Sequence, residues 1–193
     1  DVSSLDELEQ AGKKHQIRTV EGMGPKTEEK ILQGIATVQR TAGRTLYRDA
    51  AEQLAALGRH LDGLSEVEQW EAAGSYRRGR ETVGDLDVVL RASDRKKATE
   101  SLLRHDAVDK VISRGKERVS VRLEGGLQVD FRFFDAAAFG AALMHFTGSK
   151  GHNIRLRRMA QDKDWKINEY GLFKDSKRLA AKTEESIYQR LGM

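Results

Sequence analysis

Residues 74–87 read GSYRRGRETVGDLD, and the interpretation of the whole chain begins with this stretch. Asp85 and Asp87 open the apolar run DLDVVL, which is typical of a β-strand. Residues two apart in a strand point to the same face of the sheet. We therefore expect both carboxylates on one face, with Leu86 and Val88 on the other.

The residues around this pair of aspartates favour a binding site. Two aspartates alone are more typical of the exposed face of an edge strand. Here Gly74 and Ser75 follow a predicted strand and open a short helix, where free backbone N–H groups favour a phosphate. Arg78 can add a charge-assisted hydrogen bond to a phosphate oxygen. Gly84 allows the backbone to come close to a ligand.

A third carboxylate, Asp130, lies in the later strand-like run LQVDFRFF. Three carboxylates from two neighbouring strands can hold two hard divalent cations, Mg²⁺ or Mn²⁺, on oxygen ligands. Two such ions can activate an attacking hydroxyl and stabilise the leaving phosphate of an in-line displacement. The sequence therefore predicts a two-metal site beside a phosphate site.

The composition sets broader limits. The chain has 193 residues, of which 38% are hydrophobic and 33% charged, with a formal net charge of +4. This is a soluble globular profile, and its basic excess allows a polyanionic partner. The absence of cysteine excludes disulfides and thiolate zinc sites. No membrane span or signal peptide is evident, so we expect a cytoplasmic protein, nucleoid-associated if bacterial. Because the chain begins at Asp1, we expect a fragment of a longer protein.

The periodicity of apolar residues predicts a helical N-terminal part, an α/β middle and a small α+β end. Ser4 and Glu7 form a capping-box pattern at the start of the first helix. Further helices are predicted after Pro25, over 46–61, 94–104, 136–146 and 152–160, and after Thr183. Strands are predicted over 67–73, 85–92, 110–114, 118–124, 127–134, 165–168 and 170–174, with a hairpin turn at Glu124-Gly125-Gly126.

Four segments in order along the chain resemble the X family of DNA polymerases, the family of DNA polymerase beta. They are GSYRRGRETVGDLD, VDFR, HFTGSKGHNIRLRR and KINEYGLF. The first alone would indicate only a nucleotidyltransferase, while FTGS and NEY point to the X family, and TGSKGHN with the ending YQRLGM is closer to its bacterial members. The resemblance implies an α/β (α+β) fold: a helix–hairpin–helix, fingers-like subdomain over 1–42, a nucleotidyltransferase palm with a mixed sheet over 43–136, and a small α+β thumb over 137–193.

The resemblance also implies roles for single residues. Asp85 and Asp87 would bridge both metals, and Asp130 would bind the catalytic metal beside the primer 3′-hydroxyl. Arg132 and Glu169 resemble a pair that exchanges partners as the enzyme closes. The implied contacts of the incoming nucleotide are Gly74, Ser75, Arg78, Gly84 and Arg44 with its phosphates, Phe146 and Gly148 with its sugar, and Asn153 with its base.

Other implied positions are less closely matched. Arg157 would contact the template strand, although a run of arginines is usually a solvated helix face. Arg44, expected at a helix start, lies in a segment without a matching motif. His145 stands where vertebrate enzymes carry tyrosine. Alternatively, His145 only ends a helix, where a partly charged imidazole is favourable.

The segment VEGMGPKTEEKI resembles a helix–hairpin–helix motif. Its turn would aim the backbone N–H groups of Gly22 and Gly24 at a DNA phosphate, with added contacts from Lys26 and Thr27. Such contacts position DNA and read no sequence. The alternative is an ordinary corner between two helices, and Glu28 stands where the motif usually has a small residue.

The resemblance implies a template-directed DNA polymerase that fills short gaps in DNA repair. Its partners would be gapped or primer–template DNA and a dNTP, and it would act as a monomer without a membrane. Two alternatives remain open. A template-independent or small-molecule nucleotidyltransferase shares the GS and DxD elements but has no reason to carry a helix–hairpin–helix. A non-catalytic DNA-binding module has no reason to keep three aspartates.

Overall fold

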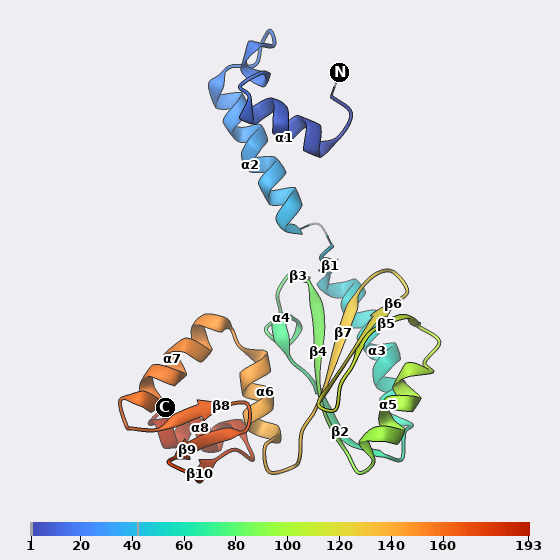
Figure 1. Cartoon of the computed structure of the whole chain (residues 1–193), viewed down its shortest axis with the longest axis vertical. Coiled ribbons are helices and arrows are strands. Elements are labelled where there is room, and N and C mark those ends of the chain that lie inside the picture. Colours follow the sequence, from blue (N-terminus) through green and yellow to red (C-terminus); the bar gives the residue numbers. More distant parts are fainter. Residues whose placement is uncertain (1, 42) are drawn as a thin grey trace. The chain divides into compact units, whose positions relative to one another are not determined.

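The computed structural model describes residues 2–41 and 43–193, and side chains except over 36–41. It consists of two compact units, Asp1–Gly43 and Arg44–Met193 (Figure 1). Residues 1 and 42, which bound the predicted first subdomain, lie outside the described residues. No helix in the described ranges is both long and apolar enough to cross a membrane.

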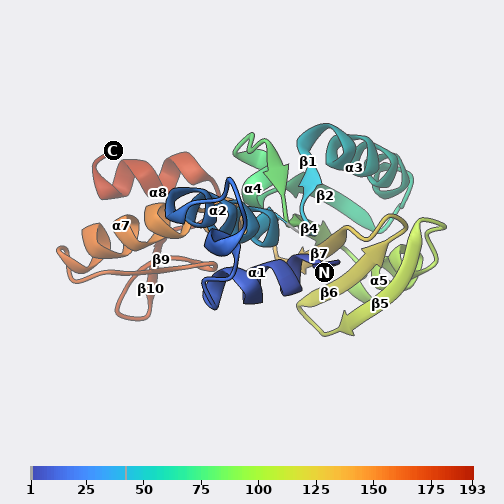
Figure 2. The same ribbon diagram turned by 90° about the horizontal axis from the view of Figure 1, so that it is seen from above.

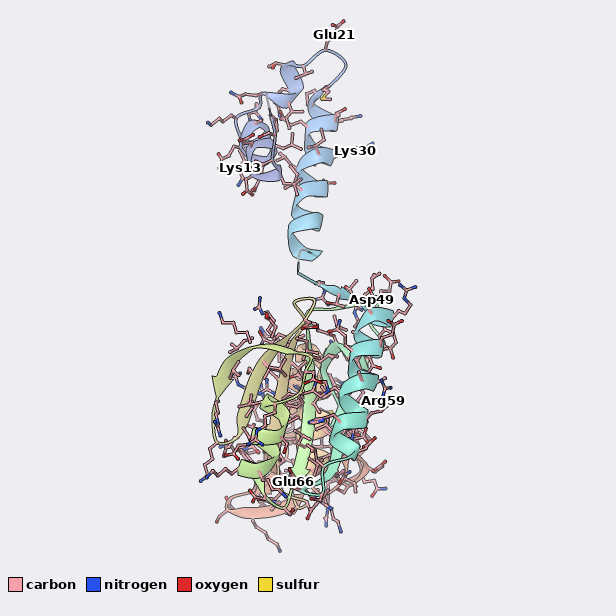
Figure 3. All side chains as sticks on the ribbon, turned by 90° about the vertical axis from the view of Figure 1, so that its right-hand side faces the viewer. Lys13, Glu21, Lys30, Asp49, Arg59 and Glu66 are labelled. Atoms are coloured by element: carbon pink, nitrogen blue, oxygen red, sulfur yellow. The ribbon has the colours of Figure 1, made fainter. Side chains whose placement is uncertain are left out.

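The N-terminal unit is a pair of helices joined by a short 3₁₀ helix and a turn. Its elements are α1 (Leu5–Lys13), η1 (Ile17–Thr19) and α2 (Pro25–Thr41). Ser4 caps α1 by accepting a hydrogen bond from the Glu7 N–H at 3.2 Å, as the capping-box pattern predicts. Glu21 projects from the tip of the turn before α2, while Lys13 and Lys30 project from the helices (Figure 3).

Glu28 holds this helix pair together from inside. Its side chain is only 1% exposed, and it accepts hydrogen bonds from Arg18 Nε at 2.8 Å and from the Arg18 backbone N–H at 3.1 Å. His15 Nδ1 lies 3.0 Å from the same carboxylate. Burial raises the pKa of Glu28, but the hydrogen bonds from His15 and Arg18 outweigh it and lower the pKa to about 2. Glu28, which stands where the helix–hairpin–helix motif usually has a small residue, therefore stabilises the packing inside this unit.

A five-stranded mixed sheet forms the first part of the second unit. Its strand order is β2-β4-β7-β6-β5, and only the β4–β7 pair is parallel. The hairpin predicted at Glu124-Gly125-Gly126 connects β6 to β7, with positive φ at both glycines. The strands are β2 (Val67–Ala72), β4 (Asp85–Ala92), β7 (Gln128–Phe133), β6 (Arg118–Leu123) and β5 (Val108–Arg114).

Helices α3 (Tyr47–Asp62) and α5 (Arg95–Leu103) cover one face of this sheet. The spacing of Leu54, Leu57 and Leu61 gives α3 an apolar stripe that packs onto Leu86 and Phe131. All five side chains are at most 6% exposed. Because this face is filled with apolar side chains, the polar residues that alternate with them on β4 and β7 face the other way.

The rest of the unit packs on the second face and beside it. Helix α6 (Phe139–Thr147) covers Val89 of β4, and a second core joins α6 to α7 (Lys150–Gln161) and α8 (Glu184–Leu191). Three short antiparallel strands complete it: β8 (Lys166–Asn168), β9 (Gly171–Lys174) and β10 (Lys177–Ala180). Figure 2 shows α7, α8 and β9 on the side away from α5. The predicted mixed α/β (α+β) fold class is confirmed, whereas β10 was not predicted.

Candidate active site

The carboxylates predicted to act together lie on two neighbouring parallel strands. Asp87 of β4 and Asp130 of β7 are register partners, and Asp85 precedes Asp87 on the same face. Asp85 is exposed, Asp87 is half-buried and Asp130 is only 4% exposed, whereas Leu86 and Val88 are fully buried. Since β4 lies between β2 and β7, the alternative of an exposed edge strand is wrong.

Gly74 allows the start of the short helix α4 (Gly74–Arg77) to touch Asp87. The Ala73 N–H donates to the Asp87 carbonyl at 2.8 Å, and Gly74 has φ +61°. A Cβ atom at Gly74 would lie only 2.8 Å from Asp87 Oδ2. Both the backbone conformation and the contact therefore require glycine. The close contact between Gly74 and Asp87 places the Gly74-Ser75 turn against the face of the sheet that carries the aspartates.

Arg132 bridges the two register partners. Its Nε donates to Asp87 Oδ1 and its Nη2 donates to Asp130 Oδ2, both at 3.1 Å. The guanidinium carbon also lies 4.2 Å from the centroid of the Phe146 ring, which is a cation–π contact. Arg132 therefore connects the carboxylates to the end of α6.

Two further residues hold Asp130, and neither was predicted. Gln128 Nε2 donates to Asp130 Oδ1 at 2.9 Å, and Arg118 Nη1 lies 3.7 Å from Asp130 Oδ2. The position of Gln128 two residues before Asp130 was a signal that could have been used, because such residues share a face. Arg118 lies near Asp130 because β6 pairs with β7. The sequence around Arg118 does not reveal this pairing.

Burial raises the pKa of Asp87 above its ordinary value. Arg132 opposes this effect, while the nearby carboxylates of Asp85 and Asp130 reinforce it. Ionisation of Asp87 is thus less favourable than that of an ordinary aspartate, and additional positive charge at the site would favour it.

The oxygen atoms suit a hard divalent cation, but Arg132 occupies the space between them. Among the residues that the structure describes, no three carboxylate or histidine side chains converge closely enough to hold a metal ion. The donor set itself fits, because Asp85, Asp87 and Asp130 offer only carboxylate oxygens on one face. Release of Arg132 would free Asp87 Oδ1, whereas Asp130 Oδ2 would still have Arg118 at 3.7 Å.

The residues implied to contact phosphates surround this face. Arg78 donates a short hydrogen bond to the carbonyl of Thr147, next to Gly148 at the end of α6. Arg44 precedes β1 (Thr45–Leu46) and does not open a helix. The β1 strand pairs with β3 (Thr82–Val83), so that Arg44 donates to the Thr82 hydroxyl at 3.0 Å and carbonyl at 2.6 Å. A Cβ atom at Gly84 would lie 3.2 Å from Arg44 Nη1. Arg44 thus reaches the residue before Asp85.

The sugar and base residues lie around the break between α6 and α7. Gly148 has φ +66° and separates the two helices, as predicted. Asn153 on α7 donates its side-chain amide to the His145 carbonyl at 2.7 Å, which ties the helices together. Phe146 packs 5.8 Å from Phe134, centroid to centroid. The predicted sugar and base residues are therefore neighbours.

His145 lies half-buried in the last turn of α6. Burial lowers its pKa, and the arginines at 132 and 157 lower the pKa further against the opposing charge of Glu169. The lowered pKa disfavours the charged imidazole of the alternative, whereas the position of His145 in the last turn of α6 agrees with it. Glu169 is half-buried in the turn after β8, and Arg132 pairs with the aspartates in this structure. Arg157 is exposed on α7.

Family comparisons match this unit closely. The DNA polymerase beta palm model matches residues 44–131, and the DNA polymerase beta thumb model matches residues 142–193. The DNA polymerase/3'-5' exonuclease PolX of Bacillus subtilis (strain 168) is 35% identical over 173 residues, which cover 89% of this chain. The chain belongs to the X family of DNA polymerases.

Other members of the X family are similar over shorter stretches. A repair DNA polymerase X of African swine fever virus is 29% identical over 134 residues, covering 63% of this chain and 74% of the viral protein. DNA polymerase lambda of Arabidopsis thaliana is 28% identical over 122 residues, covering 52% of this chain and 23% of that protein. The chain spans 30% of the length of the Bacillus protein. The predicted resemblance, bacterial members included, is confirmed.

The predicted DNA-binding turn belongs to the N-terminal unit and connects η1 to α2. Gly22 has φ +82°, and no atom lies within 4 Å of a Cβ placed at Gly22 or Gly24. Within the described residues, neither glycine N–H donates a hydrogen bond, whereas the Thr27 N–H donates to the Gly24 carbonyl at 2.9 Å. Lys26 is exposed at the start of α2. The turn therefore presents free N–H groups and a cation on its surface.

Proposed function

We propose that this chain is a template-directed DNA polymerase that adds a dNMP to a primer 3′-hydroxyl, with short-gap filling in DNA repair as its task. Membership in the X family supports the reaction, and the name of the viral relative supports the repair role. The observation that carries the proposal is the register pairing of Asp87 with Asp130, with Asp85 beside them on the same face.

Two divalent metal ions, Mg²⁺ or Mn²⁺, fit the three carboxylates. When bound, they would supply the positive charge that favours an ionised primer hydroxyl and stabilises the leaving pyrophosphate. Asp85 and Asp87 would hold both ions, and Asp130 would hold the ion on the primer side. The raised pKa of Asp87 agrees with this assignment, because added positive charge would oppose the effect of burial and of the neighbouring carboxylates.

Arg132 would have to leave the carboxylates before metals bind. Its present bonds to Asp87 and Asp130 place a single positive charge where the ions would lie. Glu169, half-buried after β8, is the proposed second partner of this guanidinium. The cation–π contact with Phe146 would be adjusted in the same movement, since that ring lies on α6.

The incoming dNTP would lie between the Gly-Ser turn and the start of α7. In this proposal its phosphates contact Gly74, Ser75, Arg78, Gly84 and Arg44, its sugar contacts Phe146 and Gly148, and its base contacts Asn153. The proximity of Arg78 to the Thr147 carbonyl supports this placement, because it brings the phosphate and sugar residues together.

DNA would be held through its backbone. Gly22, Gly24, Lys26 and Thr27 would contact a phosphate, and Arg157 would contact the template strand. The free N–H groups of the turn support the first contact. We further propose that residues 1–42, 43–136 and 137–193 serve as fingers-like, palm and thumb subdomains, and that the protein acts as a cytoplasmic monomer.

Gap filling on DNA with each of the four templating bases tests this function. We expect incorporation of the complementary nucleotide in each case, with either Mg²⁺ or Mn²⁺ and not with chelator. A parallel reaction on single-stranded primer separates the polymerase from a template-independent transferase. Addition that ignores the templating base would overturn the proposal, and so would DNA binding with no addition under any metal condition.

A further inference from the structure

A groove lies beside Trp165, just after the end of α7, in the part of this unit that matches the thumb model. Its volume is about 360 Å³, within the range of ~300–1,000 Å³ typical of small-ligand sites. It lies between α7 and β8, which pack against each other. Its lining residues are Arg157, Gln161, Trp165, Lys166, Ile167 and Asn168.

Trp165 lines this groove with a half-buried side chain. Its backbone N–H donates to the Ala160 carbonyl at 2.8 Å, which fixes the loop after α7. The side chain packs against the core of α7 and α8, and Lys163 Nζ lies over the ring, 5.5 Å from its centroid. Within the described residues, its indole N–H has no hydrogen-bond partner. A partly exposed indole ring in a groove is a suitable stacking platform for a base.

The other tryptophan provides a contrast within the same chain. Trp70 also lines a groove of similar volume, about 330 Å³. However, its indole N–H donates to Asp62 at 2.7 Å, and its ring fills the space above Gly58. Its groove contains two carboxylates, Asp62 and Glu68. The Trp165 groove contains none and has two cationic side chains instead, so only that groove suits a phosphate-bearing ligand.

The Trp165 groove shares three lining residues with a small cavity beside the proposed nucleotide site. Arg157, Ile167 and Asn168 also line a small neighbouring cavity together with His145 and Asn153. A strand whose base pairs with an incoming nucleotide near Asn153 can therefore continue past Arg157 to Trp165.

We propose that the Trp165 groove binds the first unpaired template nucleotide beyond the templating base. Its base stacks on Trp165, and its phosphates contact Arg157 and Lys166. This inference rests on the proposed polymerase function. Stacking on an aromatic ring is tolerant of sequence, because every base presents a π-face. The groove would thus hold the unpaired template strand away from the site of nucleotide addition, whatever its base sequence.

Fluorescence of Trp165 provides the test. In the Trp70→Phe variant of the full chain, Trp165 is the sole indole. Primer–template DNA with a 5′ template overhang of zero, one, two or four nucleotides is titrated into it. We expect quenching to begin with the second overhang nucleotide, together with tighter binding. An abasic residue at that position should abolish the quenching and weaken binding roughly fivefold or more.

The Lys166→Gln variant tests the phosphate contact. Lys166 is exposed on β8, so its replacement should leave folding unchanged. We expect the slope of log affinity against log salt to fall by about 0.7 on DNA with a two-nucleotide overhang. Lys177→Gln, an exposed lysine on β10 outside the groove, is the matched control and should change nothing.

Two results would overturn the groove assignment. One is quenching that is equal for all overhang lengths or unaffected by the abasic residue. The other is quenching by a dNTP alone, which would assign the groove to the incoming nucleotide. Nucleotide addition on the one-nucleotide overhang is measured separately, because that template does not reach the groove. Failure of that reaction would contradict the proposed function and not the groove.

Discussion

Gly74→Ala is predicted to impair nucleotide addition by displacing Asp87, with only an ordinary loss of stability. The new Cβ atom would lie 2.8 Å from Asp87 Oδ2, and an ordinary contact begins at 3.4 Å. The carboxylate oxygen must therefore move by about 0.6 Å, the difference between these distances. Because a misplacement of ~1 Å can cost about a hundredfold in rate, we expect a loss of about tenfold.

Gly79 offers a matched control a few residues away. It has φ +64°, close to the +61° of Gly74, but no atom lies within 4 Å of a Cβ placed there. Both alanine variants should lose about 1–2 kcal/mol of stability from the left-handed backbone conformation. Only Gly74→Ala brings a methyl group against a carboxylate of the proposed site.

Urea unfolding and single-turnover nucleotide addition at saturating DNA measure the two effects separately. We expect similar free energies of unfolding for the two variants and a reduced rate only for Gly74→Ala. Equal rates in the two variants would refute the reasoning, because they would show that the contact between Gly74 and Asp87 does not position the carboxylate.

Three further predictions concern other charged residues. Arg132→Ala should tighten Mn²⁺ binding in the absence of DNA, because the guanidinium no longer competes for the carboxylates; calorimetry showing unchanged or weaker binding would contradict this. Glu28→Gln should lower the melting temperature at pH 7. The folded pKa of Glu28 is depressed to about 2, so its stabilisation is present above the unfolded pKa and lost as pH falls through about 2. The melting temperatures of wild type and Glu28→Gln should therefore converge in acid. A difference in melting temperature that stays constant with pH would be inconsistent with the ion cluster around Glu28. Lys26→Ala should weaken DNA binding and reduce the salt slope by about 0.9, whereas Lys30→Ala on the next turn should not, and identical slopes would remove Lys26 from the interface.

The sequence predicted those parts of the fold that depend on local pattern. The alternation in DLDVVL and the glycine pair after Glu124 correspond to β4 and to the β6–β7 hairpin. The strand β10 was missed because Lys177 and Arg178 are exposed and show no apolar alternation. The turn before it has φ +53° at Asp175, a residue that gives a weaker turn signal than glycine.

The three carboxylates of the proposed site could be predicted from the sequence, but the hydrogen bonds and ion pairs that hold them could not. Two-residue spacing placed Asp85 and Asp87 on one face, and the strand-like run LQVDFRFF supplied Asp130 as their partner. The bridge from Arg132 to both strands depends on the parallel register of β4 and β7, which neither segment reveals alone. The antiparallel register of β6 and β7, which is also non-local, brings Arg118 to Asp130.

Single-turnover filling of a one-nucleotide gap by wild type and Asp130→Asn tests the central claim most directly. Asparagine keeps the shape of the side chain and its hydrogen bond from Gln128 but removes the charge that a metal requires. We predict DNA affinity close to wild type and a rate of addition lower by at least about a hundredfold, with either Mg²⁺ or Mn²⁺. Addition by Asp130→Asn at a rate near that of wild type would contradict the assignment of these carboxylates as the catalytic site.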